Sequence, residues 1–191
     1  MEFPTRKSIR LKKYDYSLGG AYFVTICVQD YICRFGSLKK SKVILNNVGN
    51  MIKKWWFELP NKFDKIENDV FIVMPNHIHG IILMFDSDIS IVGADLCVCP
   101  DNNILGEHIG SPLQNNNRSL SKIIQWFKTM TTNEYIRNVK EYNWEKFEKR
   151  LWQRNYYEHI IRNQKSFNKI GEYIYNNPAK WKHDELFITN L

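Results

Sequence analysis

Two histidines, His77 and His79, are separated by one residue in the segment HIHGIILMF. Apolar and β-branched residues follow them, which predicts a strand, and side chains two apart on a strand point to the same face. The two imidazoles would therefore converge while Ile78 points to the opposite, core face. Imidazole is a frequent ligand of divalent metals, so the pair is suited to a metal site. A structural role is the alternative, because this spacing is not specific by itself.

A second candidate group lies near the C-terminus, at Tyr173 and Asn177. Residues 164–177 have the apolar spacing of a helix, in which each residue advances by about 100°. This spacing puts Tyr173 and Asn177 side by side, one turn apart, and Tyr175 on the opposite flank. A phenol beside an amide, facing paired histidines, would make a compact phosphoryl-transfer site. In the alternative, Tyr173 is a boundary residue of an amphipathic helix and Asn177 is a C-cap.

The elements that must position these groups follow the order strand, helix, strand, strand, helix, strand, helix. This order predicts an α+β fold of the ferredoxin-like (split βαβ) type, with an antiparallel sheet, helices on one face, and an added C-terminal helix carrying the candidate nucleophile. Pro60 and Pro178 are expected to end the first and last helices. The expected strands are 21–29, 69–74, 77–85 and 152–161, with an additional short one at 96–99, and the expected helices are 46–59, 119–135 and 164–177.

Length and composition restrict the class of protein. A chain of 191 residues suits one domain, and 43% hydrophobic with 14% aromatic residues excludes disorder as its overall state. No apolar run approaches the ~20 residues of a membrane span, and no apolar segment follows the basic N-terminus as in a secretory signal. Four cysteines do not make a disulfide scaffold in a chain this long, so we expect a reduced, cytoplasmic protein. We expect a basic arm at 1–20, one domain at 21–182 with an acidic loop at 86–117, and a tail at 183–191.

The net charge of +7 is unevenly distributed. Residues 86–117 contain five acids and no Lys or Arg, so the remainder carries +12. Aromatic residues are interleaved with the basic clusters, and cations beside rings fit a surface for single-stranded nucleic acid. A solvated basic face is the alternative. The clusters comprise Arg6, Lys7, Arg10, Lys12 and Lys13; Lys39, Lys40 and Lys42; and Lys146, Lys149, Arg150 and Arg154.

The segment MPNHIHGIIL is preceded by YFVTICVQ and followed by WQRNYYEHIIRN and YIYNNP. In this order the motifs resemble those of the single-tyrosine HUH transposases, and among them the REP-associated tyrosine transposases. The resemblance runs from about residue 6 to about residue 182 and leaves out 86–117. It implies that His77 and His79 bind Mg²⁺ or Mn²⁺, that Tyr173 is the nucleophile, and that Asn177 completes the metal site. Related enzymes can carry the longer Gln at that last position.

The resemblance also implies a function. The protein would cleave and rejoin single-stranded DNA containing hairpins through a 5′-phosphotyrosine intermediate. It would need no nucleotide cofactor and would not associate with a membrane. It would be a monomer or a homodimer, cytoplasmic and associated with the nucleoid. Two alternatives are a catalytically silent regulator that binds hairpin DNA or RNA, and a metal-dependent nuclease that uses water in place of tyrosine. The expected DNA contacts are Arg6, Lys7, Arg10, Lys12, Lys13, Arg118, Lys122 and Arg154.

Overall fold

The computed structural model describes residues 15, 16, 18–85, 119–184, 186 and 187. Its centre is a four-stranded sheet with the strand order β4-β5-β1-β6, in which every neighbouring pair is antiparallel. This spatial order, with helices after the first and third of these strands, confirms the ferredoxin-like prediction. The strands are β1 (Gly20–Cys27), β4 (Ile66–Val73), β5 (His77–Met84) and β6 (Tyr157–Ile161).

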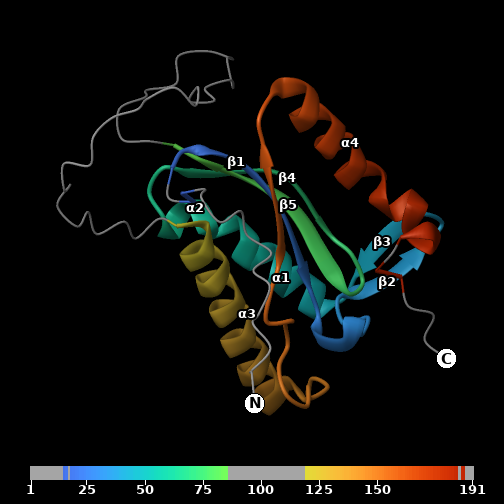
Figure 1. Cartoon of the computed structure of the whole chain (residues 1–191). Coiled ribbons are helices and arrows are strands. Elements are labelled where there is room, and N and C mark those ends of the chain that lie inside the picture. Colours follow the sequence, from blue (N-terminus) through green and yellow to red (C-terminus); the bar gives the residue numbers. More distant parts are fainter. Residues whose placement is uncertain (1–14, 17, 86–118, 185, 188–191) are drawn as a thin grey trace, which may run out of the picture.

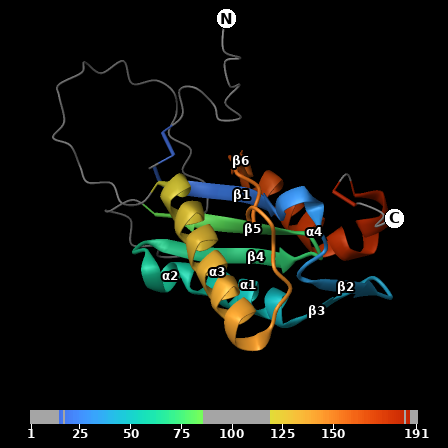
Figure 2. The ribbon, with the colours of Figure 1, turned by 90° about the horizontal axis from the view of Figure 1, so that it is seen from below.

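Two helices, α1 (Asn47–Phe57) and α3 (Leu120–Tyr142), cover one face of the sheet (Figures 1 and 2). Both begin at the predicted caps, because the Asn46 side chain accepts a hydrogen bond from the amide of Gly49 and the Ser119 side chain accepts one from the amide of Lys122. The main core lies under them, and at its centre the Trp56 ring stacks on another aromatic ring of the sheet. A short helix α2 (Leu59–Lys62) follows α1 and contains Pro60 in its first turn.

The last helix, α4 (Gln164–Lys180), lies on the opposite face of the sheet (Figure 1). Its apolar stripe packs on β5 and β1 and forms a second, smaller core with Ile81 and Leu83. The expectation that Pro178 ends this helix is wrong, since α4 continues for two more residues. Buried Asn177 and Trp181 flank the proline and hold the final turn, where a missing amide donor costs only one hydrogen bond. A 3₁₀ turn, η2 (Trp181–His183), follows.

The structure also differs from the sequence prediction in three local elements. A hairpin of β2 (Gly36–Lys39) and β3 (Lys42–Leu45) was not expected, because its turn uses Lys40 and Ser41 in the left-handed region, with φ of 49° and 58°, instead of the usual Asn-Gly. Helix α3 runs to Tyr142, seven residues beyond the expected end. The expected strand at 152–161 pairs regularly only from Tyr157 onward.

Several predicted features lie outside the described residues, namely most of the basic arm, the acidic loop at 86–117 and the short strand at 96–99. Within the described part of the chain, no helix combines the length and the apolarity needed to cross a bilayer. A 3₁₀ turn, η1 (Gln29–Tyr31), connects β1 to the segment before the hairpin, and its Tyr31 carbonyl accepts a hydrogen bond from the side chain of Asn76.

Candidate metal and nucleophile site

His77 and His79 both point from β5 toward α4, on the face opposite Ile78, as the strand period predicts. The antiparallel register sets them beside Cys27 and Thr25 of β1. Their Nε2 atoms lie 2.9 Å apart. Both side chains are buried, because α4 and the turn after it cover this part of the sheet.

Asn76 fixes the tautomer of His77. The side-chain amide nitrogen of Asn76 donates to the backbone carbonyls of Tyr31, at 3.0 Å, and Leu186, at 2.8 Å. The oxygen of the same amide therefore faces Nδ1 of His77, at 2.8 Å. Since an amide oxygen only accepts hydrogen bonds, Nδ1 of His77 must carry the proton, and its Nε2 presents a lone pair to the site.

The ring of His79 is held from β1. Its Nδ1 lies 2.7 Å from the hydroxyl oxygen of buried Thr25, and its ring stacks on Phe23 with centroids 5.4 Å apart. A hydroxyl that accepts the Nδ1 proton leaves Nε2 of His79 available as a ligand. Phe23 and Thr25 lie two positions apart on β1, so their side chains point to the same face of the sheet, which is the face that carries the histidines.

Burial keeps both imidazoles neutral. It lowers the pKa of His77 to about 3. It also lowers the pKa of His79 well below its usual range, and the neighbouring His77 lowers it further, while the carboxylate of Asp184 acts in the opposite direction. Two ligands that bind one ion at 2.0–2.1 Å and at right angles lie about 2.9 Å apart, so the spacing of the two Nε2 atoms fits a shared cation. The 2.9 Å between the two Nε2 atoms is also the length of a hydrogen bond, which Nε2 of His79 donates to His77 in the tautomer whose Nδ1 accepts from the Thr25 hydroxyl.

Asp184 completes a group of three possible metal ligands. The ligand atoms of His77, His79 and Asp184 all lie within 4.8 Å of one another. The turn η2 bends the chain back so that Asp184 enters the site, where its Oδ1 accepts from the amide of Leu186 at 2.8 Å. Sequence reasoning missed this residue, which lies in the segment expected to be a tail.

Asn177 forms a hydrogen bond with the carboxylate of Asp184. Its side-chain nitrogen donates to Oδ2 of Asp184 at 2.9 Å. Its Oδ1 oxygen is buried, with no hydrogen-bond partner among the described residues. An unsatisfied amide oxygen next to a carboxylate and two imidazoles is a suitable fourth ligand for a hard cation. The prediction that Asn177 takes part in the metal site therefore has a structural basis, while direct ligation remains a prediction.

The hydroxyl of Tyr173 lies 3.4 Å from Nε2 of His79. The Tyr173 ring meets Phe23 edge-on, with centroids 6.1 Å apart, so Phe23 contacts both the phenol and the imidazole. Tyr173 is 45% exposed, which leaves its ring accessible from solvent. Tyr175 is 82% exposed, consistent with its predicted place on the opposite flank of the helix. The structure thus brings together all four predicted site residues, which come from β5 and α4.

Two other tyrosines occupy different surroundings. Tyr157 lies on β6 opposite Thr25, and Tyr31, by its charge and a hydrogen bond, raises the pKa of Tyr157. A higher pKa makes its phenolate harder to form. The ring of Tyr156 lies on the other side of that strand, 5.7 Å from the ammonium of Lys128.

The predicted DNA contacts are only partly described. Lys122 is in the first turn of α3. Arg154 is exposed in the segment that leads into β6. The other six, Arg6, Lys7, Arg10, Lys12, Lys13 and Arg118, lie outside the described residues.

Comparison with known proteins finds similarity to transposases. Residues 107–177 match the family described as "Transposase IS200 like", a range that includes Tyr173 and Asn177 and begins after the two histidines. An uncharacterized protein of Haemophilus influenzae is 37% identical over 183 residues, which are 96% of this chain and 93% of that protein. A second protein of that organism, provisionally named a REP-associated tyrosine transposase, is 23% identical over 175 residues, which are 90% of this chain and 77% of that protein.

Among solved structures, a REP-associated tyrosine transposase bound to a REP hairpin has a similar fold. Its TM-score is 0.55 and its sequence identity 19%, and the match covers 90% of this chain and 74% of that one. At this level of identity the similarity concerns the arrangement of helices and strands.

Proposed function

The chain belongs to the IS200-like transposases, among which it resembles the REP-associated tyrosine transposases, and we propose that it cleaves and rejoins single-stranded DNA next to hairpins. The observation that carries this proposal is the position of the Tyr173 hydroxyl, 3.4 Å from Nε2 of His79. A half-exposed phenol next to buried, neutral imidazoles and a carboxylate is suited to covalent phosphoryl transfer.

We assign Mg²⁺ or Mn²⁺ to His77, His79 and Asp184, with Asn177 beside them. The 2.9 Å spacing of the two Nε2 atoms and the unsatisfied oxygen of Asn177 support this assignment. A cation bound there would supply positive charge that polarises a scissile phosphate and favours loss of the phenolic proton. Because Asp184 takes part, the catalytic unit of this proposal extends beyond residue 182.

The proposed reaction is an exchange of phosphodiester bonds. The oxygen of Tyr173 attacks the phosphorus and loses its proton, the bond from phosphorus to the 3′-oxygen breaks, and that oxygen takes up a proton and leaves as a 3′-OH. The product strand remains attached through a 5′-phosphotyrosine. Attack by another 3′-OH reverses the step and releases Tyr173, so no nucleotide cofactor is needed. Contacts of Phe23 with both His79 and Tyr173 hold the phenol at the site.

The test is the formation of a covalent adduct. A labelled single strand containing a hairpin is incubated with the protein and Mn²⁺, and the products are separated under denaturing conditions. We expect a protein-linked strand for the unaltered protein and for Tyr175→Phe, and none for Tyr173→Phe. Hairpin binding, measured by fluorescence anisotropy, should remain within about twofold in both variants, since each loses only one hydroxyl.

Other outcomes would contradict this proposal. Adducts that persist in Tyr173→Phe would place the nucleophile elsewhere, and Tyr157 would be examined next. Cleavage without any adduct would indicate a hydrolytic nuclease. Metal-independent binding without cleavage would indicate a regulatory protein that binds hairpins.

A further inference from the structure

The strand β6 carries an imidazole that the proposed site does not use. His159 is exposed at the middle of this strand and pairs directly with Phe23 of β1. Residues directly opposite each other in an antiparallel pair share a face of the sheet, with Cβ atoms about 4.5–5.5 Å apart. The next β6 residue on that face, Ile161, packs in the core under α4. His159 therefore lies on the face that carries His79 and Tyr173.

Phe23 lies between this imidazole and the proposed nucleophile. Its ring centroid is 5.4 Å from that of His79 and 6.1 Å from that of Tyr173. His159 is on the other side of Phe23, because β6 adjoins β1 at the edge of the sheet, away from β5. Tyr173 and His159 are both accessible to solvent, so a ligand can touch both of them.

The proposed cleavage requires a proton donor for the leaving 3′-oxygen. In the reverse step the incoming 3′-OH must give up the same proton. His77 and His79 are unsuited to this task, since burial keeps them neutral and their Nε2 atoms are the proposed ligands of the cation. Imidazole is the side chain that most readily gains and loses a proton near neutral pH, and an exposed one can act in both directions.

The arrangement of the site leaves space for the leaving oxygen toward β6. The attacking and leaving oxygens lie on opposite sides of phosphorus in such a transfer, roughly in line. The proposed cation ligands come from β5 and from the C-terminal end of α4 with the turn after it. A phosphodiester at the Tyr173 hydroxyl would thus have the cation on one side and the exposed sheet face around His159 on the other.

We propose that His159 is the general acid and base for the 3′-oxygen, a role that rests on the proposed function. In cleavage its imidazolium gives a proton to the 3′-oxygen as the bond from that oxygen to phosphorus breaks. In rejoining the neutral ring takes the proton of the incoming 3′-OH as that oxygen attacks phosphorus and Tyr173 leaves. The phenolic proton of Tyr173 passes to solvent in the first step and returns in the second, so both side chains end as they began.

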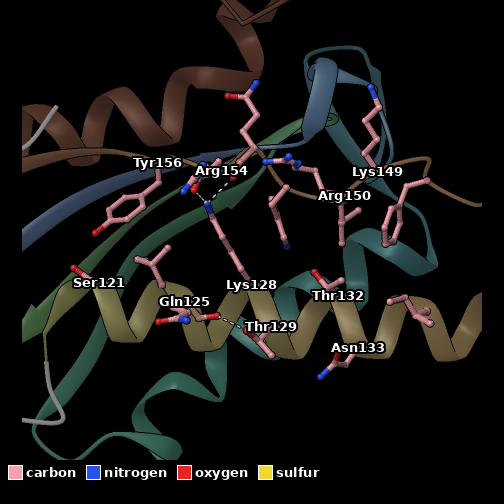
Figure 3. A pocket seen from close by; sticks show the side chains of 16 residues that line it. Ser121, Gln125, Lys128, Thr129, Thr132, Asn133, Lys149, Arg150, Arg154 and Tyr156 are labelled. Carbon is pink, nitrogen blue, oxygen red and sulfur yellow. Dashed lines mark hydrogen bonds between the residues drawn. The ribbon is translucent and has the colours of Figure 1, made fainter. Parts of the chain in front are cut away.

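The strand β6 is held in place at both ends. Before it, the ammonium of Lys128 on α3 donates to the carbonyls of Gln153, at 2.8 Å, and Asn155, at 3.0 Å (Figure 3). This contact fixes residues 147–156 beside α3, where the two segments enclose a groove of about 680 Å³ on the other face of the sheet. After β6, the side chain of Asn163 caps α4. A reacting group on a fixed strand keeps its position without further ordering.

Titratable groups face His159 from its own strand and from α4. On β6, Tyr157 lies two residues away on the same face, and the charge of Tyr31 raises its pKa, which keeps the phenol protonated. On α4, the helical period places exposed Lys169 one turn before Tyr173 on the same flank. An ammonium there adds positive charge on the side where the phosphate would lie.

The test replaces the 3′-oxygen of the scissile bond by sulfur, after the cleavage position has been mapped with the unaltered protein. A thiolate leaves without being protonated, so a general acid is not needed for this substrate. In single-turnover assays with Mn²⁺, His159→Ala should form adducts about 100-fold more slowly on the oxygen substrate. On the sulfur substrate it should stay within about threefold of the unaltered protein.

Two further readouts separate proton transfer from a structural role. Added imidazole should restore adduct formation by His159→Ala on the oxygen substrate, because the small base can occupy the exposed position. The decline in rate at high pH that the unaltered protein shows with oxygen should be absent with sulfur, where no imidazolium is required. Hairpin binding in EDTA should remain within about twofold, since this role concerns the transition state.

Tyr157→Phe is the matched control, since it removes an exposed hydroxyl from the same face of β6. It should leave both rates within about threefold of the unaltered protein. Equal slowing of the two substrates by His159→Ala, no slowing of either, or a loss of hairpin binding would overturn the assignment. Slowing confined to the oxygen substrate in Tyr157→Phe alone would transfer the role to that phenol.

The outcome is distinguishable from failure of the proposed function. If the unaltered protein forms no adduct on either substrate, strand transfer is rejected and the role of His159 is rejected with it. If adducts form and depend on Tyr173, while His159→Ala treats both substrates alike, the proposed function stands and only the acid–base role is rejected.

Discussion

The phenol oxygen of Tyr173 lies 3.4 Å from Nε2 of His79, although ninety-four positions separate the two residues in the sequence. Hydrophobic packing produces this contact, since Ile174, the next residue on α4, is buried in the core that Ile81 shares on β5. The geometry of the proposed nucleophile therefore depends on how firmly α4 is seated on the sheet.

Removing the carboxylate of Asp184 should weaken cation binding. Among the described residues, Asp184 is the one anionic member of the cluster, so we expect Asp184→Asn to lower the affinity for Mn²⁺ at least about tenfold, measured by isothermal titration calorimetry. Glu141→Gln, an exposed acid on α3, is the matched control and should bind Mn²⁺ normally. Unchanged affinity in Asp184→Asn would remove this residue from the site.

The hydroxyl of Thr25 should raise the affinity of the same site for Mn²⁺ without contacting the cation. Thr25→Val keeps the shape of the buried side chain and removes the group that lies 2.7 Å from Nδ1 of His79. Loss of such a supporting contact typically lowers metal affinity by 10–100-fold. Calorimetry with Mn²⁺ should show this loss, while Thr129→Val, on the exposed face of α3, should show none. Equal affinities would mean that packing alone orients the His79 ring.

Without bound cation, the protein should lose stability as the pH falls below about 6.5. Burial lowers the pKa of His77 to about 3, so between these values the unfolded chain binds more protons than the folded one. His77 therefore does not lower the free energy of unfolding above pH 6.5. Toward pH 3 the free energy of unfolding falls progressively, by about 1.4 kcal/mol for each pKa unit of difference. Urea unfolding in EDTA at several pH values measures the slope of the free energy of unfolding.

The histidine variants identify the source of this slope. His77→Gln should make it shallower, because the neutral amide takes up no proton in the unfolded chain. His159→Gln, at an exposed position of β6, serves as the control. If the slope stays the same in His77→Gln, the acid sensitivity originates in other groups.

Two glycines should respond in opposite directions to replacement by alanine. A Cβ atom at Gly80 would lie 2.3 Å from the buried ring of Trp56, so Gly80→Ala should destabilise the fold by about 1–3 kcal/mol. At Gly171, inside α4, the nearest atom would be a methyl group of Val70 at 3.6 Å, an ordinary contact. Gly171→Ala should stabilise the fold by about 0.5–1 kcal/mol through helix propensity. Urea unfolding tests both, and similar effects would show that Trp56 can move aside.

The sequence predicted the parts of the site that depend on local periodicity. Alternation along β5 placed His77 and His79 on one face, and the helical period separated Tyr173 from Tyr175. Both predictions need only the spacing within one element, which the backbone geometry determines. The succession of strands and helices along the chain also predicted the ferredoxin-like fold class.

The rest of the site depends on contacts between distant segments. Asp184 enters the cluster because η2 turns the chain back, and no local pattern indicates where such a turn is directed. Thr25 supports His79 only through the pairing of β1 with β5. The groove between α3 and residues 147–156 was missed for the same reason, since the basic cluster near Arg150 was visible in the sequence but its position beside α3 (Figure 3) was not.

Asn76 connects η1, the segment after η2 and the ring of His77 through one side chain. Transplanting the paired imidazoles onto another protein scaffold would therefore require more than a strand with the right spacing. Without carbonyl groups to satisfy the amide nitrogen, Asn76 could rotate and present that nitrogen to Nδ1, which would move the imidazole proton onto the ligating atom. A designer who copied only the histidines would obtain a pair of rings whose tautomers are not set in advance for binding an ion.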